Sequence, residues 1–313
     1  MPVIATDFGG TKIKLGVVDN GRIIAATSVT ARAEESIENN LEYITTFLRT
    51  FLKQQNINRD SISGFGMALP VIVDSEQNRV LTEYVKYKDA KGFDFNNWFK
   101  QNWGVTLQLE NDARAALVGE WKYGAGKNCN NIVMLTLGTG VGSAVITNGK
   151  LLKGAHYMAG NMTGHTTINA DGVACNCGST GCLESEASTW ALPEIAKRFD
   201  NLGNSPLANK NNLDFNDLIT AIENGDELAN KIFKHCVNIW GIAAANLVHS
   251  FDPERIIVSG GIMKSASKIL PVLEHSVDKR TWLEPGTVKV VAAEQVDFAA
   301  LLGLAYLLKD KVS

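Results

Sequence analysis

Long hydrophobic runs and clusters of a single charge are both missing from this sequence of 313 residues. No apolar segment approaches the roughly 20 residues of a membrane-spanning helix, so we expect no membrane partner. The net charge is −3 and no long basic run occurs, so nothing points to nucleic acid as a partner either. Met1 leads directly into an apolar stretch without a charged leader segment, which predicts a cytoplasmic protein.

Cysteine is scarce as well, but three of the five cysteines fall close together, at Cys175, Cys177 and Cys182, with His165 shortly before them. Zinc in structural sites takes four nitrogen or sulfur ligands, and one histidine with three cysteines is a common set. Glycines between the last two cysteines allow a tight backbone. Two alternatives are unrelated buried thiols and a disulfide. The clustering argues against the first, and the predicted cytoplasmic location argues against the second.

Two glycine-rich hairpins follow one pattern. The first reads Asp7-Phe8-Gly9-Gly10-Thr11-Lys12 between two predicted strands, and the second reads Gly138-Thr139-Gly140 between two more. When Gly10 is aligned with Gly138, a later Asn-Gly pair also coincides without a gap, at 20–21 and 148–149. Backbone amides in such turns can wrap a phosphate. We interpret the pattern as an internal repeat that supplies two phosphate-binding turns across a cleft; chance similarity is the alternative.

A carboxylate stands at the end of another predicted strand. Residues 107–109 form this strand, Glu110-Asn111-Asp112 follows, and a helix is expected over 113–121. Side chains at the carboxyl ends of strands are where α/β proteins bind ligands. The residues alone leave a second interpretation open, in which Asp112 only caps the helix.

Three short motifs together resemble the signature of the ROK family of sugar kinases: Gly164-His165, Cys175-Asn176-Cys177-Gly178 and Gly181-Cys182-Leu183-Glu184. The resemblance extends from Asp7 to the last predicted helix. It implies an α/β, two-lobed, actin-like ATPase fold with duplicated ribonuclease H-like domains and a cleft between the lobes. The last helix of such proteins packs on the N-terminal lobe. We therefore expect one lobe over 1–116, completed by 298–313, and a second, with the zinc motif, over 117–297.

The resemblance also implies a function, the transfer of phosphate from ATP to a sugar hydroxyl. Asp112 would be the general base, and Asn111, His165 and Glu184 would contact the sugar. His165 would also bind a structural zinc together with Cys175, Cys177 and Cys182. The nucleotide and its Mg²⁺ would be bound by Asp7, Gly9, Gly10, Thr11, Lys12, Gly138, Thr139, Gly140, Gly260 and Gly261. A homodimer or homotetramer is expected.

The sequence departs from the family pattern on the sugar side only. The family has Ala-Gly-Glu shortly before Gly-His, whereas this chain has an extra residue there and places Asn161 or Met162 at the Glu position. Val71 replaces a glycine, and segment 83–89 replaces an Asn-Leu/Ile-x-Gly-Trp motif. Because a site that pairs hydroxyls discriminates strongly, the lost partners predict a ligand other than glucose.

Two other functions are compatible with the resemblance. One is a sugar-responsive regulator, for which the short stretch before Asp7 leaves no room for a helix-turn-helix. The other is a non-catalytic ROK-like protein, against which the intact Asp112 argues.

Overall fold

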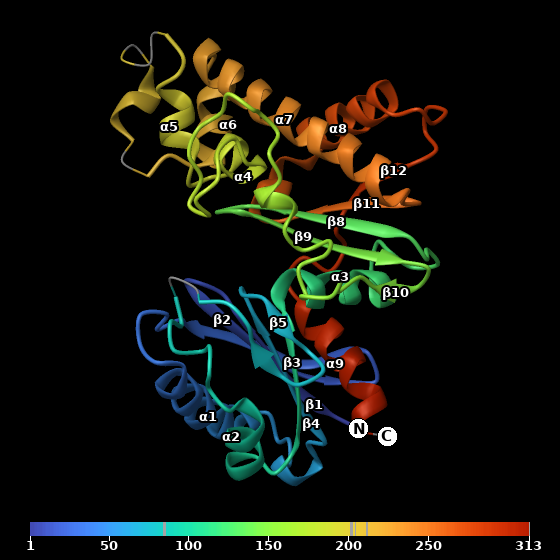
Figure 1. Ribbon diagram of the computed structural model, residues 1–313. Coiled ribbons are helices and arrows are strands. Elements are labelled where there is room, and N and C mark those ends of the chain that lie inside the picture. Colours follow the sequence, from blue (N-terminus) through green and yellow to red (C-terminus); the bar gives the residue numbers. More distant parts are fainter. Residues whose placement is uncertain (84–85, 201–202, 204, 211, 313) are drawn as a thin grey trace. The chain divides into compact units, whose positions relative to one another are not determined.

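The computed structural model describes residues 1–83, 86–200, 203, 205–210 and 212–312 (Figure 1). The chain divides into two compact units. Unit 1 comprises residues 1–127, 153–158 and 294–313, and unit 2 comprises residues 128–152 and 159–293. The boundary expected after residue 116 falls inside helix α3 (Asp112–Tyr123), and the structure keeps this whole helix in unit 1.

Unit 1 is built on a five-stranded sheet with the order β3-β2-β1-β4-β7. The first three strands form an antiparallel meander, and β1, β4 and β7 run parallel. The strands are β1 (Val3–Phe8), β2 (Lys12–Asp19), β3 (Arg22–Thr30), β4 (Gly64–Leu69) and β7 (Thr106–Asn111). A small hairpin of β5 (Val73–Asp74) and β6 (Arg79–Val80) follows β4. Asn20 and Gly21 both have positive φ, of 48° and 73°, as expected of the turn between β2 and β3.

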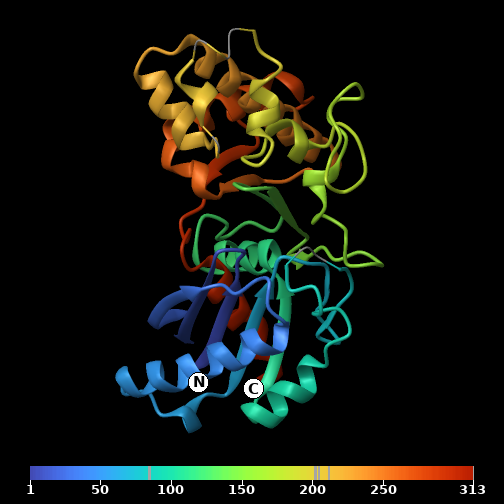
Figure 2. The ribbon, with the colours of Figure 1, turned by 90° about the vertical axis from the view of Figure 1, so that its left-hand side faces the viewer.

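Helices cover both faces of this sheet. On one face α1 (Ile37–Gln54) and α2 (Phe95–Asn102) pack on the large apolar side chains of β1, β2 and β4 (Figure 2). On the other face lie α3 and α9 (Ala299–Val312). Glycines bring these two helices together, because a Cβ at Gly119 would overlap the carbonyl of Ala299, and one at Gly303 would overlap the carbonyl of Ala115. The last helix thus packs on the sheet of unit 1.

Unit 2 repeats the strand arrangement of unit 1. Its sheet has the order β10-β9-β8-β11-β12, again with an antiparallel meander followed by parallel strands. The strands are β8 (Ile132–Leu137), β9 (Val141–Thr147), β10 (Lys150–Leu151), β11 (Arg255–Ser259) and β12 (Lys289–Ala292). Asn148 and Gly149 have φ values of 49° and 67° and repeat the turn of unit 1. The shared topology confirms the internal repeat.

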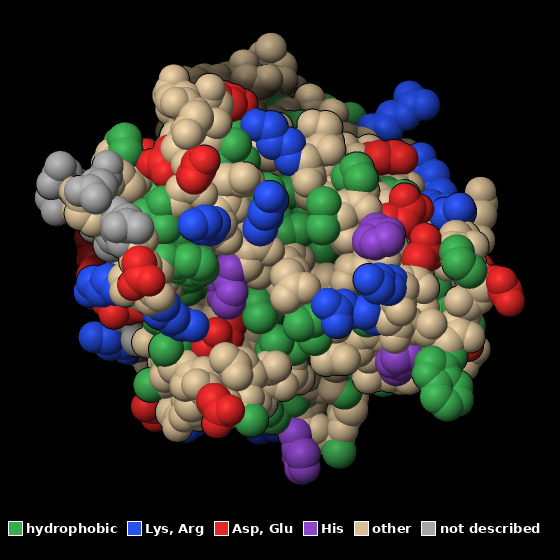
Figure 3. All heavy atoms as spheres, turned by 90° about the horizontal axis from the view of Figure 1, so that it is seen from above, with side chains coloured by type: hydrophobic (Ala, Val, Ile, Leu, Met, Phe, Trp, Pro, Cys, Tyr) green, Lys and Arg blue, Asp and Glu red, His purple; other side chains and the backbone are tan. Residues whose placement is uncertain are grey.

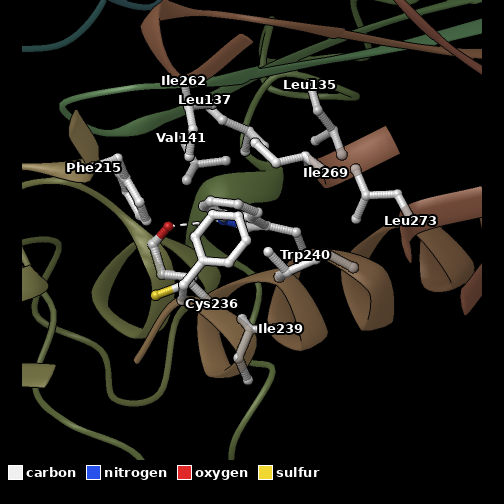
Figure 4. Packing of buried hydrophobic residues seen from close by; sticks show 14 of the residues in the cluster. Leu135, Leu137, Val141, Phe215, Cys236, Ile239, Trp240, Ile262, Ile269 and Leu273 are labelled. Carbon is white, nitrogen blue, oxygen red and sulfur yellow. Dashed lines mark hydrogen bonds between the residues drawn. The ribbon is translucent and has the colours of Figure 1, made fainter. Parts of the chain in front are cut away.

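The core of unit 2 lies between its sheet and its helices, with Trp240 near the centre (Figure 4). The helices are α4 (Leu183–Ala187), α5 (Leu192–Ala196), α6 (Phe215–Glu223), α7 (Glu227–Phe251) and α8 (Ala266–Arg280). Trp240 is buried, packs against Phe215 at 5.1 Å between ring centroids, and donates its indole N–H to the carbonyl oxygen of Ala187 at 2.8 Å. Because the hydrogen bond reaches the end of α4, the core fixes the segment that follows the cysteine cluster.

Figure 3 shows a face of the molecule on which basic, acidic and hydrophobic side chains are interspersed. In unit 2, a groove between α7 and α8 is lined by Phe233 and Val272, with Lys234, Lys268 and Arg280 around them. No helix in the described part of the chain is long and apolar enough to cross a membrane.

Candidate active site

The parallel strands of unit 1 bring two carboxylates to one edge of the sheet. In the parallel register Asp7 on β1 pairs with Ala68 on β4, which pairs with Glu110 on β7. Asp112 begins α3 directly after β7 and interacts electrostatically with Asp7. The carboxyl ends of the strands therefore bring Asp7 and Asp112 close together, although they lie about a hundred residues apart in sequence.

The two carboxylates have perturbed acidities. Burial, followed by the negative charge of Asp7, raises the pKa of Asp112 to about 7. Burial also raises the pKa of Asp7, and the positive charge of Lys14 opposes this rise. A carboxyl group with a pKa near neutrality can take up a proton at physiological pH, as a general base must.

Asn111, not Asp112, caps helix α3. Its Oδ1 accepts a hydrogen bond from the backbone N–H of Arg114 at 3.1 Å, and its Nδ2 donates to the carbonyl oxygen of Val71 at 3.1 Å. The Asp112 carboxylate accepts the N–H of the next residue, Ala113, at 2.8 Å. The interpretation of Asp112 as a plain helix cap is therefore wrong, because the preceding residue already fills that position.

The first glycine turn, residues 9–11, joins β1 to β2. The N–H of Gly9 donates to the carbonyl oxygens of Asp7 and Lys12, at 3.2 and 3.1 Å. Among the described residues, no acceptor receives the N–H groups of Gly10 and Thr11. The turn thus presents two backbone donors to a ligand, which is the arrangement that binds anions.

Two side chains from the divergent segment 83–89 hold this turn, a contact that no sequence pattern indicated. The hydroxyl of Tyr87 donates to the carbonyl oxygen of Gly9 at 2.9 Å, and the ammonium of Lys86 donates to that of Gly10 at 3.3 Å. Tyr87 is buried and adopts a φ of 53°, which is uncommon for a bulky residue. Tyr84, in the same segment, lies outside the described residues. Lys86 and Tyr87 therefore support the first glycine turn, whereas their segment was interpreted from the sequence only as a departure on the sugar side.

The second glycine turn joins β8 to β9 and is held by the segment after α4. The N–H groups of Thr189 and Trp190 donate to the carbonyl oxygens of Gly138 and Thr139, at 3.0 and 3.1 Å. In the described part of the chain, the N–H groups of Thr139 and Gly140 have no acceptor. Each turn thus has two amides without a described acceptor, but only those of Thr11 and Thr139 correspond when Gly10 is aligned with Gly138. The N–H of Gly138 differs from that of Gly10, because it donates to the carbonyl oxygen of Gly140 at 3.1 Å.

A third turn follows β11. Gly260 has a φ of 102°, and a Cβ there would overlap the backbone of Leu137. A Cβ at Gly261 would have no neighbour within 4 Å. Gly260 is therefore required by backbone packing, while Gly261 lies in open space and can admit a ligand.

The histidine and three cysteines of the predicted zinc site come together in unit 2. Their possible ligand atoms all lie within 4.8 Å of one another. Cys175 Sγ is 3.6 Å from His165 Nδ1, and Cys177 Sγ is 3.6 Å from Cys182 Sγ. Zinc bonds of about 2.0–2.3 Å at tetrahedral angles place ligand atoms at this kind of spacing. All three cysteines are free thiols, so the disulfide alternative is wrong.

A buried carboxylate that the sequence did not single out supports this cluster. Glu186 accepts the N–H of Val173 at 2.9 Å and pairs with the guanidinium of Arg198 at 2.8 Å. Its side chain is 0% exposed. The hydrogen bond from Val173 fixes the loop that carries Cys175 to the helix that follows Cys182, and the charge pair joins the same carboxylate to Arg198.

The family profile of the ROK family matches residues 3–311. The chain belongs to the ROK family. The glucokinase of Thermotoga maritima is 31% identical over 100% of this chain and 98% of its own length. The ROK hexokinase of Thermus thermophilus superposes with a TM-score of 0.81 at 27% identity, over 99% of this chain and 100% of its own. A ROK family glucokinase from Streptomyces griseus, solved in complex with glucose and AMPPNP, superposes with a TM-score of 0.76 at 28% identity. The match covers 98% of this chain and 99% of that protein.

Transcriptional repressors of the family are similar over a smaller share of their own length. The xylose repressor of Caldicellulosiruptor bescii is 26% identical over 99% of this chain and 79% of its own length. The comparisons confirm the resemblance and the actin-like ATPase fold of ROK sugar kinases.

The departures from the ROK pattern have defined places in the structure. Asn161 donates its side-chain amide to the carbonyl oxygen of Ser143 on β9 at 3.0 Å, and Met162 directly precedes the turn that holds His165. Val71 contributes the carbonyl that Asn111 binds. Asn161, one of the two residues that can stand at the Glu position of the ROK pattern, thus binds the protein itself.

Proposed function

We propose that this chain is an ATP-dependent carbohydrate kinase that phosphorylates a sugar hydroxyl. The observation that carries the proposal is Asp112, a carboxyl group with a pKa of about 7 at the strand ends of unit 1, beside Asp7. Its relatives support the same activity, because their names identify glucokinases and a hexokinase.

Asp112 acts as the general base. At neutral pH a large fraction of its carboxyl groups is ionised, and each can accept the proton of the attacking hydroxyl. Phosphoryl transfer needs little covalent chemistry from the protein, so positioning and charge stabilisation supply most of the catalysis.

The glycine turns bind the nucleotide. Gly9, Gly10, Thr11 and Lys12 in unit 1, and Gly138, Thr139 and Gly140 in unit 2, contact phosphate oxygens, and Gly260 with Gly261 borders the adenosine. Support comes from the amides of both turns that lack described acceptors. The ammonium of Lys86, which lies on the first turn, adds positive charge to the phosphates.

Asp7 is the residue that would hold Mg²⁺, directly or through water. A carboxylate oxygen is the ligand type that Mg²⁺ prefers, and Asp7 is only partly buried at the strand edge. The ion would supply charge neutralisation to the phosphates.

On the sugar side, Asn111, His165 and Glu184 contact the substrate, with Asp112. The site lacks the carboxylate that the ROK pattern has near Asn161, so the substrate is a hexose, N-acetylhexosamine or related sugar other than glucose. Substrate selection then follows from hydroxyl partners that differ from those of the glucokinases.

The cluster of His165, Cys175, Cys177 and Cys182 binds one structural zinc ion. Free thiols, a histidine nitrogen and near-tetrahedral spacing fit this metal. We further propose a cytoplasmic homodimer or homotetramer, with the first lobe completed by the C-terminal helix.

The alternative is a sugar-sensing or non-catalytic ROK protein, which the repressor relatives make reasonable. A sensor has no need for a carboxyl group with a pKa near neutrality, so Asp112 favours the enzyme.

A coupled assay of ADP release over hexoses, N-acetylhexosamines and pentoses distinguishes the two functions. We expect sugar-dependent ADP release with at least one of them. Sugar binding without any sugar-dependent ADP release would establish the sensor instead.

A further inference from the structure

The carboxylate of Glu184 faces the second glycine turn. Its Oε2 accepts the backbone N–H of Val141, the residue that ends the turn, at 2.8 Å. Its Oε1 accepts the indole N–H of Trp190 at 3.1 Å. A side chain at Gly140 would overlap the carboxylate, so the glycine permits this close approach. Both oxygens of Glu184 therefore have partners within unit 2.

These contacts divide the polar groups of the turn into two sets. The carbonyls of Gly138 and Thr139 and the N–H of Val141 are bound from the α4 side by Thr189, Trp190 and Glu184. The N–H groups of Thr139 and Gly140 lack an acceptor in the described part of the chain. Glu184 and Trp190 thereby fix the direction in which the remaining two amides can donate.

The element that carries Glu184 is itself tightly held. Cys182 is fully buried directly before α4, and the N–H of Leu183 donates to the carbonyl oxygen of Thr166 at 3.0 Å. Glu184 lies in the first turn of α4, whose end is bound by Trp240. The cysteine cluster, α4 and the glycine turn therefore form one connected piece of unit 2.

We propose that Glu184 is a positioning residue for the nucleotide, acting through Val141 and Trp190 on the amides of the second glycine turn. The inference rests on the proposed function, in which these amides bind ATP phosphates. It differs from a role in sugar contact alone, because it predicts an effect on nucleotide binding when no sugar is present.

The test is calorimetric titration of AMPPNP with Mg²⁺ into the full chain without sugar. Glu184→Gln keeps the size of the side chain but replaces one of its two acceptor oxygens by an NH₂ group, which is only a donor. The glutamine can therefore no longer accept hydrogen bonds on both sides, from the Val141 N–H and the Trp190 N–H. Hydrogen bonds to charged groups are strong enough that we expect the dissociation constant to rise about tenfold or more. Glu194→Gln, an identical change at an exposed glutamate of the same unit, should leave it unchanged.

Trp190→Phe serves as a second variant, because it removes only the indole donor and keeps the backbone hydrogen bond to Thr139. We expect a smaller rise, of about two- to tenfold. It also decides the question if Glu184→Gln does not fold. Unchanged nucleotide affinity in either folded variant, with only the Michaelis constant for sugar raised, would overturn the proposal. Wild-type protein that binds no nucleotide would instead refute the proposed function.

Discussion

Replacing Asp112 by Asn separates its proposed role as a base from its contribution to folding. General-base catalysis typically supplies a factor of 10²–10⁴, so turnover should fall by about that much. Asn cannot accept the proton, but it has nearly the same size. Because Asn111 provides the cap of α3, the substitution leaves the cap in place. Nucleotide affinity should be unchanged.

Although Asp112→Asn should lower turnover, it should raise the thermal stability of the protein at neutral and alkaline pH. The pKa of Asp112 is raised from 3.8 to about 7 in the folded protein, so the neutral acid is the form that folding favours. The free-energy cost of ionised Asp112 therefore grows as pH rises from about 4 to about 7, and is constant above. At 1.36 kcal/mol per unit this cost reaches at most about 4 kcal/mol, less any screening by solvent. Asp112→Asn should melt at a higher temperature than the wild type at pH 8, and with little difference at pH 4.

Two measurements check this reasoning, a pH series of melting temperatures and the pH dependence of kcat/KM. In the wild type, kcat/KM should decrease as the pH is lowered through about 7. At about pH 6 it should be about a tenth of its plateau at high pH. An Asp112→Asn enzyme with near-normal turnover would refute the base. If Asp112→Asn melted at a much lower temperature than the wild type at pH 8, burial of the carboxylate would not be the cause of the raised pKa.

Three further variants test the other groups. Purified protein should contain one zinc per chain, and Cys177→Ser should lose it and melt at a lower temperature; zinc-free wild type with a normally folded Cys177→Ser would contradict the site. Thr139→Val should raise the Michaelis constant for ATP or lower turnover, and kinetics equal to the wild type would remove the second turn from the nucleotide site. Lys86→Gln should raise the Michaelis constant for ATP severalfold, whereas Lys88→Gln, an exposed neighbour, should not; equal effects of the two changes would show a general charge effect.

The local parts of the fold were predictable from short patterns. Asn-Gly turns at 20–21 and 148–149 have the positive φ values that these residues favour, and the aligned glycine turns occupy matching places in two sheets of equal topology. The cysteine spacing brought the four candidate zinc ligands together, because the loop between them is short. In each case neighbours in sequence determine the geometry.

Contacts between distant segments were not predictable in this way. Tyr87 and Lys86 contact a turn that lies 76–78 residues earlier in the chain, and no local sequence pattern predicts these contacts. Helix α8 contains Pro271 in its interior, which obscures helical periodicity. The extent of α3 in unit 1 depends on its glycine-mediated packing against α9, the last helix of the chain. These features depend on tertiary packing, which a single sequence does not display.

Direct detection of the product tests whether this protein phosphorylates a sugar with Asp112 as the base. The wild type and Asp112→Asn would be incubated with ATP, Mg²⁺ and the sugar selected by the ADP assay, and the carbohydrate analysed by mass spectrometry and phosphorus NMR. The wild type should form one phosphorylated sugar for each ADP released, and the variant should form almost none. ADP released without any phosphorylated sugar, or a sugar phosphate formed equally by both proteins, would contradict it.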